Sequence, residues 1–429
     1  MNYFKKFFKS LFVYSKPKET YNFILSDSQD TSNNENDIYK DSIDCLPNSN
    51  IFDDISKNLD YIKVKYNSLI NSDIILREFT LKANNKKYKA FLVFIDGMVD
   101  SDSINNFTLR PLMKQKKSSS VSLKNVYKNF NLKDYIFSSL TPQNSMIEVT
   151  NFEDLSTNIN SGCCALIVDT LSSAFIIDVK GYDTRSISQP NNEFVIRGSQ
   201  EAFVEKLRTN TSMIRRIVNN SDLVIEKSTV GNISKTSIAI CYMKSIANND
   251  LVSEVKYRIN NIDIDYITSS GQLEQLIQDN SLIAFPQVLA TERADKASHY
   301  ILDGRVVVIV NGSPYVLIMP GTFIDFIASP EDLNLKFQFS NLLKFIRLLA
   351  VIITLLLPGF YIAVTNYHIE LLPTELLFTI AASRNSVPFP VIFETLLMEV
   401  SFELIRESGI RVPNHLGSTI GIVGALILR

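Results

Sequence analysis

Three glutamates interrupt an apolar stretch close to the end of the chain, between residues 387 and 405. They are Glu394, Glu399 and Glu403. A charged side chain at the centre of a membrane helix costs about 2.5–3.5 kcal/mol on insertion scales, unless it faces protein or water. At 100° per residue, Glu399 and Glu403 share one helical face with Glu407, whereas Glu394 points to the opposite side. The spacing therefore predicts an acidic stripe on one side of an apolar helix.

Two environments are open for this stripe. In the first, the carboxylates line a water-filled path, and the three glutamates are candidate pore or gating residues. Pro388 and Pro390 join them, because irregular backbone at membrane depth occurs only where protein buries it or a cavity borders it. In the second, the helix lies in the interface with a solvated acidic face, or its glutamates form salt bridges with Arg384 or Arg406.

An uncharged stretch from Leu348 to Ile369 is the strongest membrane signal in the chain. With the apolar residues just upstream it supplies the roughly 20 residues that a spanning helix needs. The alternative is a buried helix of a large soluble core. Pro358 and Gly359 interrupt the stretch, which a membrane helix tolerates, and Gly417 and Gly421 form a GxxxG pattern suited to close helix packing. We take these four residues as candidate packing positions.

Charge gives the predicted orientation of the span. Lys336, Lys344 and Arg347 precede it, whereas Glu370 and Glu375 follow it. The positive-inside rule then places the preceding part of the chain in the cytoplasm. The net charge is -2, from 43 basic and 45 acidic residues, which gives no indication of a nucleic-acid partner.

No catalytic, cofactor-binding or metal-binding motif is found in the sequence. It contains no P-loop, HExxH, G-x-S-x-G or paired CxxC pattern, and its three histidines are scattered. The adjacent pair Cys163-Cys164 lies in an apolar, strand-like run, and we expect buried, reduced thiols. We therefore predict that the protein is not an enzyme.

Composition and periodicity divide the chain into four parts. Residues 1–50 form a basic arm and polar tail, 51–120 a small α/β subdomain, 121–335 a larger α/β subdomain, and 336–429 a helical membrane region. The first 18 residues carry five lysines and no acid, which suits either a solvated arm or a basic segment on an anionic membrane. The predicted fold class is an α/β cytoplasmic head of two subdomains followed by an α-helical transmembrane region.

Local patterns give the elements of the head. An acidic turn at 96–100 precedes a short helix, and Gly198-Ser199 begins a predicted helix, where it could hold an anion or simply be capped by its own serine. Helices are predicted at 51–70, 151–160, 200–218, 251–260, 271–278 and from a cap at Thr291 to Leu302, and strands at 74–81, 88–95, 163–169, 174–180, 222–229, 236–243, 264–268, 305–310 and 315–319.

Several long segments are distinctive. They include QPNNEFVIRGSQEAFVEKLRTNTSMIRRIV from Gln189 to Val218, FPQVLATERADKASHYILDGRVVVIVNGSPYVLIMP from Phe285 to Pro320, and LPGFYIAVTNYHIELLPTELLFTIAASRNSVPFP from Leu357 to Pro390. In these segments the chain resembles the A subunit of the GerA family of spore germinant receptors, from about Lys133 to Leu428.

The resemblance implies a non-enzymatic role in nutrient-triggered germination, as a multi-pass protein of the spore inner membrane with a cytoplasmic head. Family A subunits are expected to assemble with a transporter-like B subunit and a lipoprotein C subunit, and to form a homo-oligomeric, nutrient-gated ion channel in contact with lipid. Nutrient recognition is expected mainly in the B subunit. Relatives continue beyond the position of Arg429, so we expect this chain to be truncated. The rival interpretations are a non-conducting scaffold that clusters receptors, and a membrane-tethered head that binds a ligand or nucleotide as an enzyme.

Overall fold

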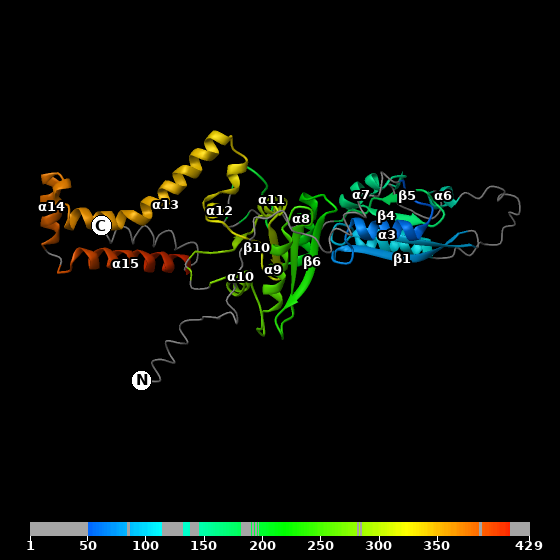
Figure 1. Cartoon of the computed structure of the whole chain (residues 1–429), viewed down its shortest axis with the longest axis horizontal. Helices are drawn as coiled ribbons and strands as arrows, with labels where there is room; N and C mark the ends of the chain where they lie inside the picture. Colours follow the sequence, from blue (N-terminus) through cyan, green and yellow to red (C-terminus); the bar gives the residue numbers. More distant parts are fainter. Residues whose placement is uncertain are drawn as a thin grey trace. The chain divides into compact units, whose positions relative to one another are not determined.

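A computed structural model describes residues 50–83, 86–113, 132–137, 146–181, 190, 193, 195, 197–280, 283, 285–385 and 388–411. The chain forms two compact units, Met1–Asn334 and Leu335–Arg429 (Figure 1). Within the described residues, every named strand belongs to the first unit. That unit contains two five-stranded sheets.

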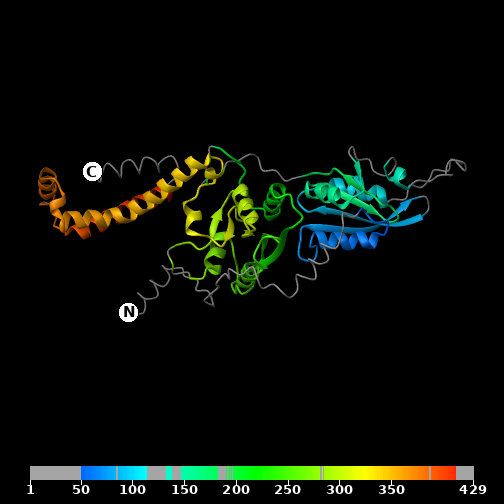
Figure 2. The same ribbon diagram turned by 45° about the horizontal axis from the view of Figure 1, so that its top comes forward.

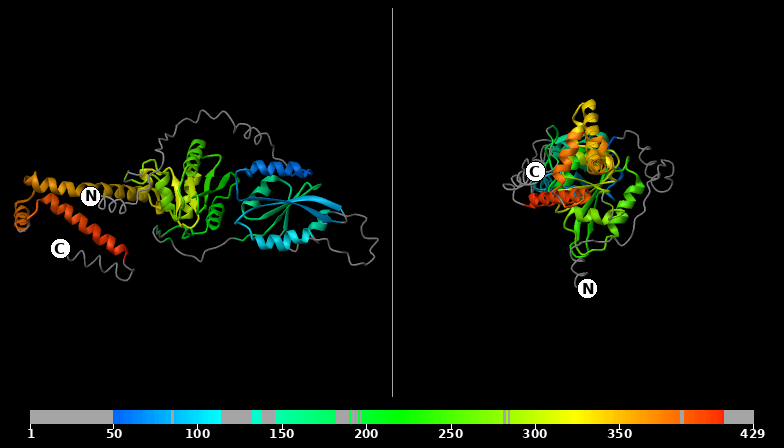
Figure 3. Two further views of the ribbon diagram at one scale, coloured as in Figure 1. Left: turned by 90° about the horizontal axis from the view of Figure 1, so that it is seen from below. Right: turned by 90° about the vertical axis from the view of Figure 1, so that its left-hand side faces the viewer.

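The first sheet is antiparallel, with strand order β1-β2-β4-β5-β3. Strand β4 is apolar along its whole length and entirely buried, because helices cover both faces of the sheet. Helices α3 and α7 cover one face, and the helical segment 101–113 covers the other with α6 (Figure 3, left). The elements are α3 (Ile55–Lys65), β1 (Ile74–Ala83), β2 (Lys86–Ile95), α4 (Ser101–Ser103), the π-helical turn η1 (Ile104–Leu109), α5 (Arg110–Met113), α6 (Leu132–Tyr135), β3 (Met146–Val149), α7 (Phe152–Asn160), β4 (Cys164–Val168) and β5 (Ala174–Ile177).

The second sheet repeats this plan with strand order β6-β7-β9-β10-β8, also antiparallel. Helices α9 and α10 pack on one face and α8 and α11 on the other (Figure 2). The central strand β9 reads VVVIV and is fully buried between them. The elements are α8 (Leu207–Ile217), β6 (Leu223–Val230), β7 (Thr236–Met243), α9 (Asn249–Asn260), α10 (Ser270–Ile277), β8 (Leu289–Thr291), α11 (Ala294–Leu302), β9 (Val306–Val310), β10 (Val316–Met319), α12 (Phe323–Ile327) and the 3-10 turn η3 (Pro330–Leu333).

Elements with strong local signals lie where the sequence predicts them. The side chain of Asn151 caps α7 by accepting a hydrogen bond from the backbone N–H of Asp154 at 2.8 Å. Gly312 follows Asn311 in the predicted hairpin turn and adopts a φ of +89°, which glycine reaches without strain. The α/β class of this unit is thus as predicted.

Three local predictions are wrong. Helix α8 begins at Leu207 rather than near Ser199, because Phe203 is buried in extended backbone whose N–H donates to the carbonyl of Glu292. No anion site therefore forms at a helix start at Ser199. Residues 264–268 form no strand, and α11 begins after Arg293 instead of at Thr291, which ends strand β8.

The predicted boundary at residue 120 does not separate the two sheets. Strands β1 and β2 precede it and β3, β4 and β5 follow it, yet all five pair in one sheet. The chain passes from the first sheet to the second between β5 and β6. One edge of β2 pairs with β4, which lies after residue 120, so residues 51–120 do not complete a sheet by themselves.

The second unit is helical in its described residues. Helix α13 (Phe337–Asn366) is long and apolar enough to cross a membrane by length and composition, and it is the one helix of the described chain that meets this criterion. At 1.5 Å per residue its 30 residues extend about 45 Å, more than a bilayer core of about 30 Å. A 3-10 turn η4 (Ile369–Leu371), α14 (Thr374–Arg384) and α15 (Val391–Arg411) follow, and α15 contacts α13 (Figure 1).

Candidate functional site

The predicted acidic stripe lies on helix α15. Glu399 and Glu403 are exposed, whereas Glu394 is half-buried in the first turn of the helix. Pro388 and Pro390 precede this turn, and the carbonyl of Pro390 accepts the backbone N–H of Glu394 at 3.1 Å. The single continuous helix keeps Glu399 and Glu403 four residues apart on one face.

One predicted salt bridge forms on this helix and another does not. Arg406 pairs with Glu403, three residues before it, and both side chains remain largely exposed. Arg384, at the end of α14, has a buried Nη2 without a hydrogen-bond partner among the described groups. The stripe is thus partly neutralised from within its own helix.

The predicted packing residues occupy different positions. Pro358 lies inside α13, and a side chain added at Gly359 would meet no heavy atom within 4 Å. Gly359 therefore has room for a packing partner on this side of α13. Gly417 and Gly421 lie outside the described residues, so their packing role stays a prediction.

A buried ion pair joins the two sheets of the first unit. Arg215 of α8 donates from Nε to Oδ2 of Asp73 at 2.8 Å and from Nη2 to Oδ1 at 2.9 Å. The two side chains are 1% and 3% exposed. The same guanidinium also donates to the carbonyl of Asn220 and to Oδ1 of Asn71. A charge this deep is tolerated because both partners are present and well bonded.

The segment before Asp73 also covers the edge of the second sheet. Asn71 accepts the N–H of Ile225 at 3.1 Å and donates to the carbonyl of Leu223, while Ser72 bonds the backbone of Ile225 and Lys227. Strand β6 is an edge strand, and these contacts satisfy groups that would otherwise be open to pairing. The residues just before β1 thereby cover the open edge of β6, mainly through the side chains of Asn71 and Ser72.

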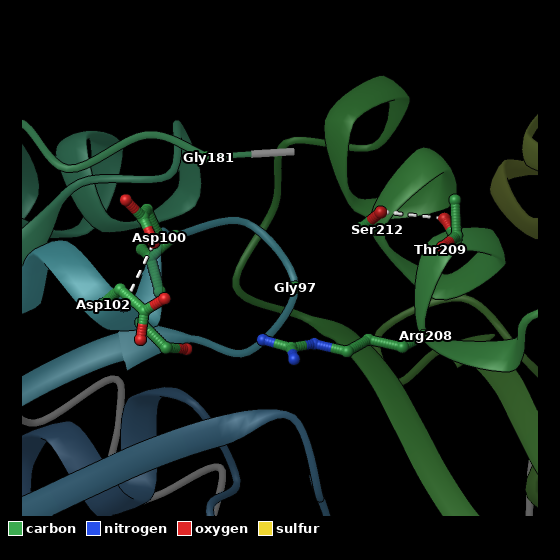
Figure 4. A pocket seen from close by; sticks show the side chains of 9 residues that line it. Gly97, Asp100, Asp102, Gly181, Arg208, Thr209 and Ser212 are labelled. Atoms are coloured by element: carbon green, nitrogen blue, oxygen red, sulfur yellow. Dashed lines mark hydrogen bonds between the residues drawn. The ribbon is translucent and has the colours of Figure 1, made fainter. Parts of the chain in front are cut away.

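A polar pocket of about 360 Å³ opens beside this junction (Figure 4). One wall comes from the loop after β2, with Gly97 and Asp100, and from Asp102 of α4, and α8 supplies the other wall with Arg208 and Ser212. Gly97 has a φ of +89°, and a Cβ there would lie 3.3 Å from the Cβ of Ser212, so the close approach of loop and helix requires a glycine.

Side chains of both charge signs line the pocket. Arg208 pairs with Asp96 at 2.6 Å, while its buried Nε has no hydrogen-bond partner among the described groups. Hydrogen bonds from Ser103 and the backbone of Asp102 lower the pKa of Asp100. With carboxylates on one wall and a guanidinium on the other, the pocket suits a small polar molecule, and its lining contains no histidine or cysteine for nucleophilic chemistry.

Sequence reasoning missed the whole junction. The acidic turn at 96–100 was visible, but Asp73 and Arg215 are separated by 142 residues. Nor does helical periodicity reveal the pair, because Arg215 shares its face of α8 with the polar residues Thr211 and Ser212.

Metal and thiol chemistry have no site in the described part of the chain. No group of three or more metal-ligating side chains is found there. Cys163, Cys164 and Cys241 are free and buried, and burial raises the pKa of each thiol. Such thiols are poor nucleophiles.

Comparison with known proteins identifies the family. A family model described as Bacillus/Clostridium GerA spore germination protein matches residues 60–429. The chain belongs to the GerA family.

Relatives support this assignment. Spore germination protein KA of Bacillus subtilis is 35% identical over 374 residues, which are 87% of this chain and 66% of that protein. Spore germination protein A1 of the same organism is 41% identical over 271 residues, 63% of this chain and 56% of that protein. This GerA-family chain thus spans about two thirds of the length of KA. The crystal structure of the N-terminal domain of the A subunit of the Bacillus megaterium spore germinant receptor GerK3 is 31% identical, covering 64% of this chain and 98% of that domain with a TM-score of 0.46.

Proposed function

We propose that this chain is an A-type subunit of a nutrient germinant receptor that triggers spore germination by forming an oligomeric, nutrient-gated ion channel. Membership of the GerA family and the similarity to spore germination proteins support the role in germination. The relatives compared above are described as germination proteins, not as enzymes. The partners of the proposed assembly are a transporter-like B subunit and a lipoprotein C subunit, in the spore inner membrane, with several spans and the head in the cytoplasm.

The acidic stripe on α15 is the observation that carries the channel proposal. An apolar helix that exposes Glu399 and Glu403 on one face needs water or a charged partner along that face. Several copies arranged around an axis would bring these faces together and provide a polar path for cations. Pro388 and Pro390 separate α15 from the preceding helix, and Glu394, in the first turn of α15, is a further candidate gating residue on the opposite face.

The channel proposal is tested by substitutions that remove the negative charge of the glutamates and keep the shape of their side chains. Spores that carry Glu399→Gln together with Glu403→Gln should release monovalent cations more slowly after nutrient addition and should lose optical density later. The matched control is Glu370→Gln, which removes one carboxylate from the turn between α13 and α14. Cation release that is unchanged in the double variant, with normal amounts of protein, would remove the channel assignment.

One observation favours a non-conducting scaffold as the second candidate. The Arg406–Glu403 ion pair supplies a partner within the helix, so one glutamate of the stripe needs no water-filled path. In this role the head clusters receptor complexes and another subunit carries the ions. Reconstitution of this chain alone in planar bilayers distinguishes the two, because a scaffold gives no conductance.

A further inference from the structure

Five large apolar side chains form an exposed patch on the first unit, beside the second sheet. Two of them, Phe285 and Ile324, are 68% and 70% exposed. We call this surface the apolar patch; its members are Ile283, Phe285, Phe323, Ile324 and Phe326, all more than a third exposed.

The patch is held together by contacts from two parts of the chain. The rings of Phe285 and Phe323 meet edge to face, with centroids 5.9 Å apart. Two residues from each of these rings in the sequence, the backbone N–H of Gly321 donates to the carbonyl of Gln287 at 3.1 Å. The exposed rings are therefore presented by a bonded pair of segments, not scattered singly over the surface.

Helix α12 turns apolar side chains outward and its charged side chain inward, the reverse of the usual surface helix of a soluble protein. Its sequence is FIDFI, and the charged residue, Asp325, is 8% exposed while Phe323 and Ile324 face outward. Arg305 donates to the Asp325 carboxylate at 2.5 Å, and Thr322 donates from its backbone and its hydroxyl, which completes a capping box. These hydrogen bonds hold the Asp325 side chain inward, and the apolar side chains of α12 therefore face outward.

The position of the patch in the chain points to a lipid bilayer as its occupant. Nine residues, 328–336, separate the end of α12 from the start of α13, so these two ends are joined by ten Cα–Cα steps and can lie at most about 35 Å apart even with the chain fully extended. Lys336, Lys344 and Arg347 at this end of α13 carry the charge that anionic headgroups attract. Five side chains are also far fewer than the 20–30 residues a side that a stable protein interface typically uses.

We infer that the apolar patch inserts into the headgroup region of the bilayer beside α13 and so ties the head to the membrane surface. The inference rests on the proposed membrane role of the chain. Shallow burial of Phe and Ile at an interface, with nearby basic residues, is the usual chemistry of such contacts.

The absence of tryptophan from the sequence allows a direct test in the full chain. Single variants Ile324→Trp and Phe285→Trp are reconstituted in vesicles of phosphatidylcholine and phosphatidylglycerol, with and without bromine on the acyl chains. Leu355→Trp, on α13 and 78% exposed, is the membrane reference, and Ile147→Trp, on β3 and 55% exposed, is the matched surface control.

Brominated lipid is expected to quench the Ile324→Trp and Phe285→Trp variants to an extent approaching the reference, and to leave Ile147→Trp unchanged. Quenching of the reference alone would overturn the lipid contact while leaving the membrane role intact. Blue-shifted emission at the patch without quenching would overturn it as well, because a protein then covers the patch. An unquenched Leu355→Trp variant would overturn the membrane role and this inference together.

Discussion

Replacing Asp73 by asparagine should destabilise the first unit severely, because it leaves the Arg215 guanidinium buried without its counter-charge. The substitution keeps the shape of the side chain, removes its negative charge and replaces one of the two oxygens that accept from Arg215, at 2.8 and 2.9 Å, by an amide that cannot accept. The partners left to Arg215 are then all neutral: the amide oxygen of the new side chain, the carbonyl of Asn220 and the amide oxygen of Asn71. Breaking one side of a buried pair costs about 3–5 kcal/mol.

The magnitude can be measured by urea unfolding of the first unit, followed by circular dichroism. A loss of 3–5 kcal/mol removes a large part of a typical stability of about 5–15 kcal/mol and lowers the melting temperature by roughly 10 °C. Asp96→Asn is the matched control, since it removes a carboxylate from the Arg208 pair, whose side chains are 42% and 27% exposed. Pairs exposed to this extent are worth about 0–1 kcal/mol.

A third variant separates the buried charge from the loss of contacts. Asp73→Leu combined with Arg215→Met removes both charges and should recover much of the lost stability, because apolar groups of similar volume replace many buried pairs at little cost. If Asp73→Asn cost no more than Asp96→Asn, the reasoning about an uncompensated buried charge would be refuted.

Three further results are expected from the first unit. Burial alone would raise the pKa of Asp325, but its hydrogen bonds outweigh this and hold the pKa at about 2. Its contribution of about 2 kcal/mol is therefore present above pH 4 and lost as the pH falls toward 2, and acid unfolding of Asp325→Asn should lack this component. Cys164 and Cys241 should resist a thiol reagent in the native protein and react after urea is added, as peptide mass analysis would show; rapid native labelling would contradict their burial. Gly181→Ala should cost about 1–3 kcal/mol, because its Cβ would lie 2.6 Å from another Cβ, whereas Gly271→Ala, with open space around it, should be neutral or slightly stabilising in the same urea titration.

Elements with a strong local code could be predicted from the sequence. The run Val306–Val310 is apolar throughout and leads into an Asn-Gly turn, so strand, turn and return strand follow from neighbouring residues alone. Strand Met146–Val149 was missed because it has four residues and contains Glu148, and it becomes a strand only by pairing with β5. Short edge strands of this kind are specified by their partners, not by their own composition.

Tertiary contacts also override local propensity before α8. Residues 200–206 read as the first turns of a helix, yet they run extended because Ala202 bridges to Arg293 and Phe203 fills the second core. The guanidinium of Arg293 is fully buried and donates to the carbonyls of Glu193 and Ser199, which fixes this course. The sequence holds no local sign of these contacts, since the partners are about 100 residues apart.

The candidate sites also fall into two groups: those that local sequence predicts and those that depend on contacts between distant segments. Periodicity alone places Glu399 and Glu403 on one face of α15, because a helix repeats every 3.6 residues whatever surrounds it. The pocket and the ion pair between the sheets depend on two distant segments meeting, and neither segment has a motif that names its partner.

The two sides of this junction differ in what holds them together. On one side a buried ion pair and hydrogen bonds to the backbone of β6 join the sheets, and water is excluded from the ion pair. On the other side Arg208, which lines the pocket, pairs with Asp96, and this partly exposed pair is screened by salt and water. Opening the pocket side therefore costs far less than separating Arg215 from Asp73. Substitutions around the pocket should change how the two sheets approach each other without unfolding the unit, whereas substitutions at the buried pair should unfold it.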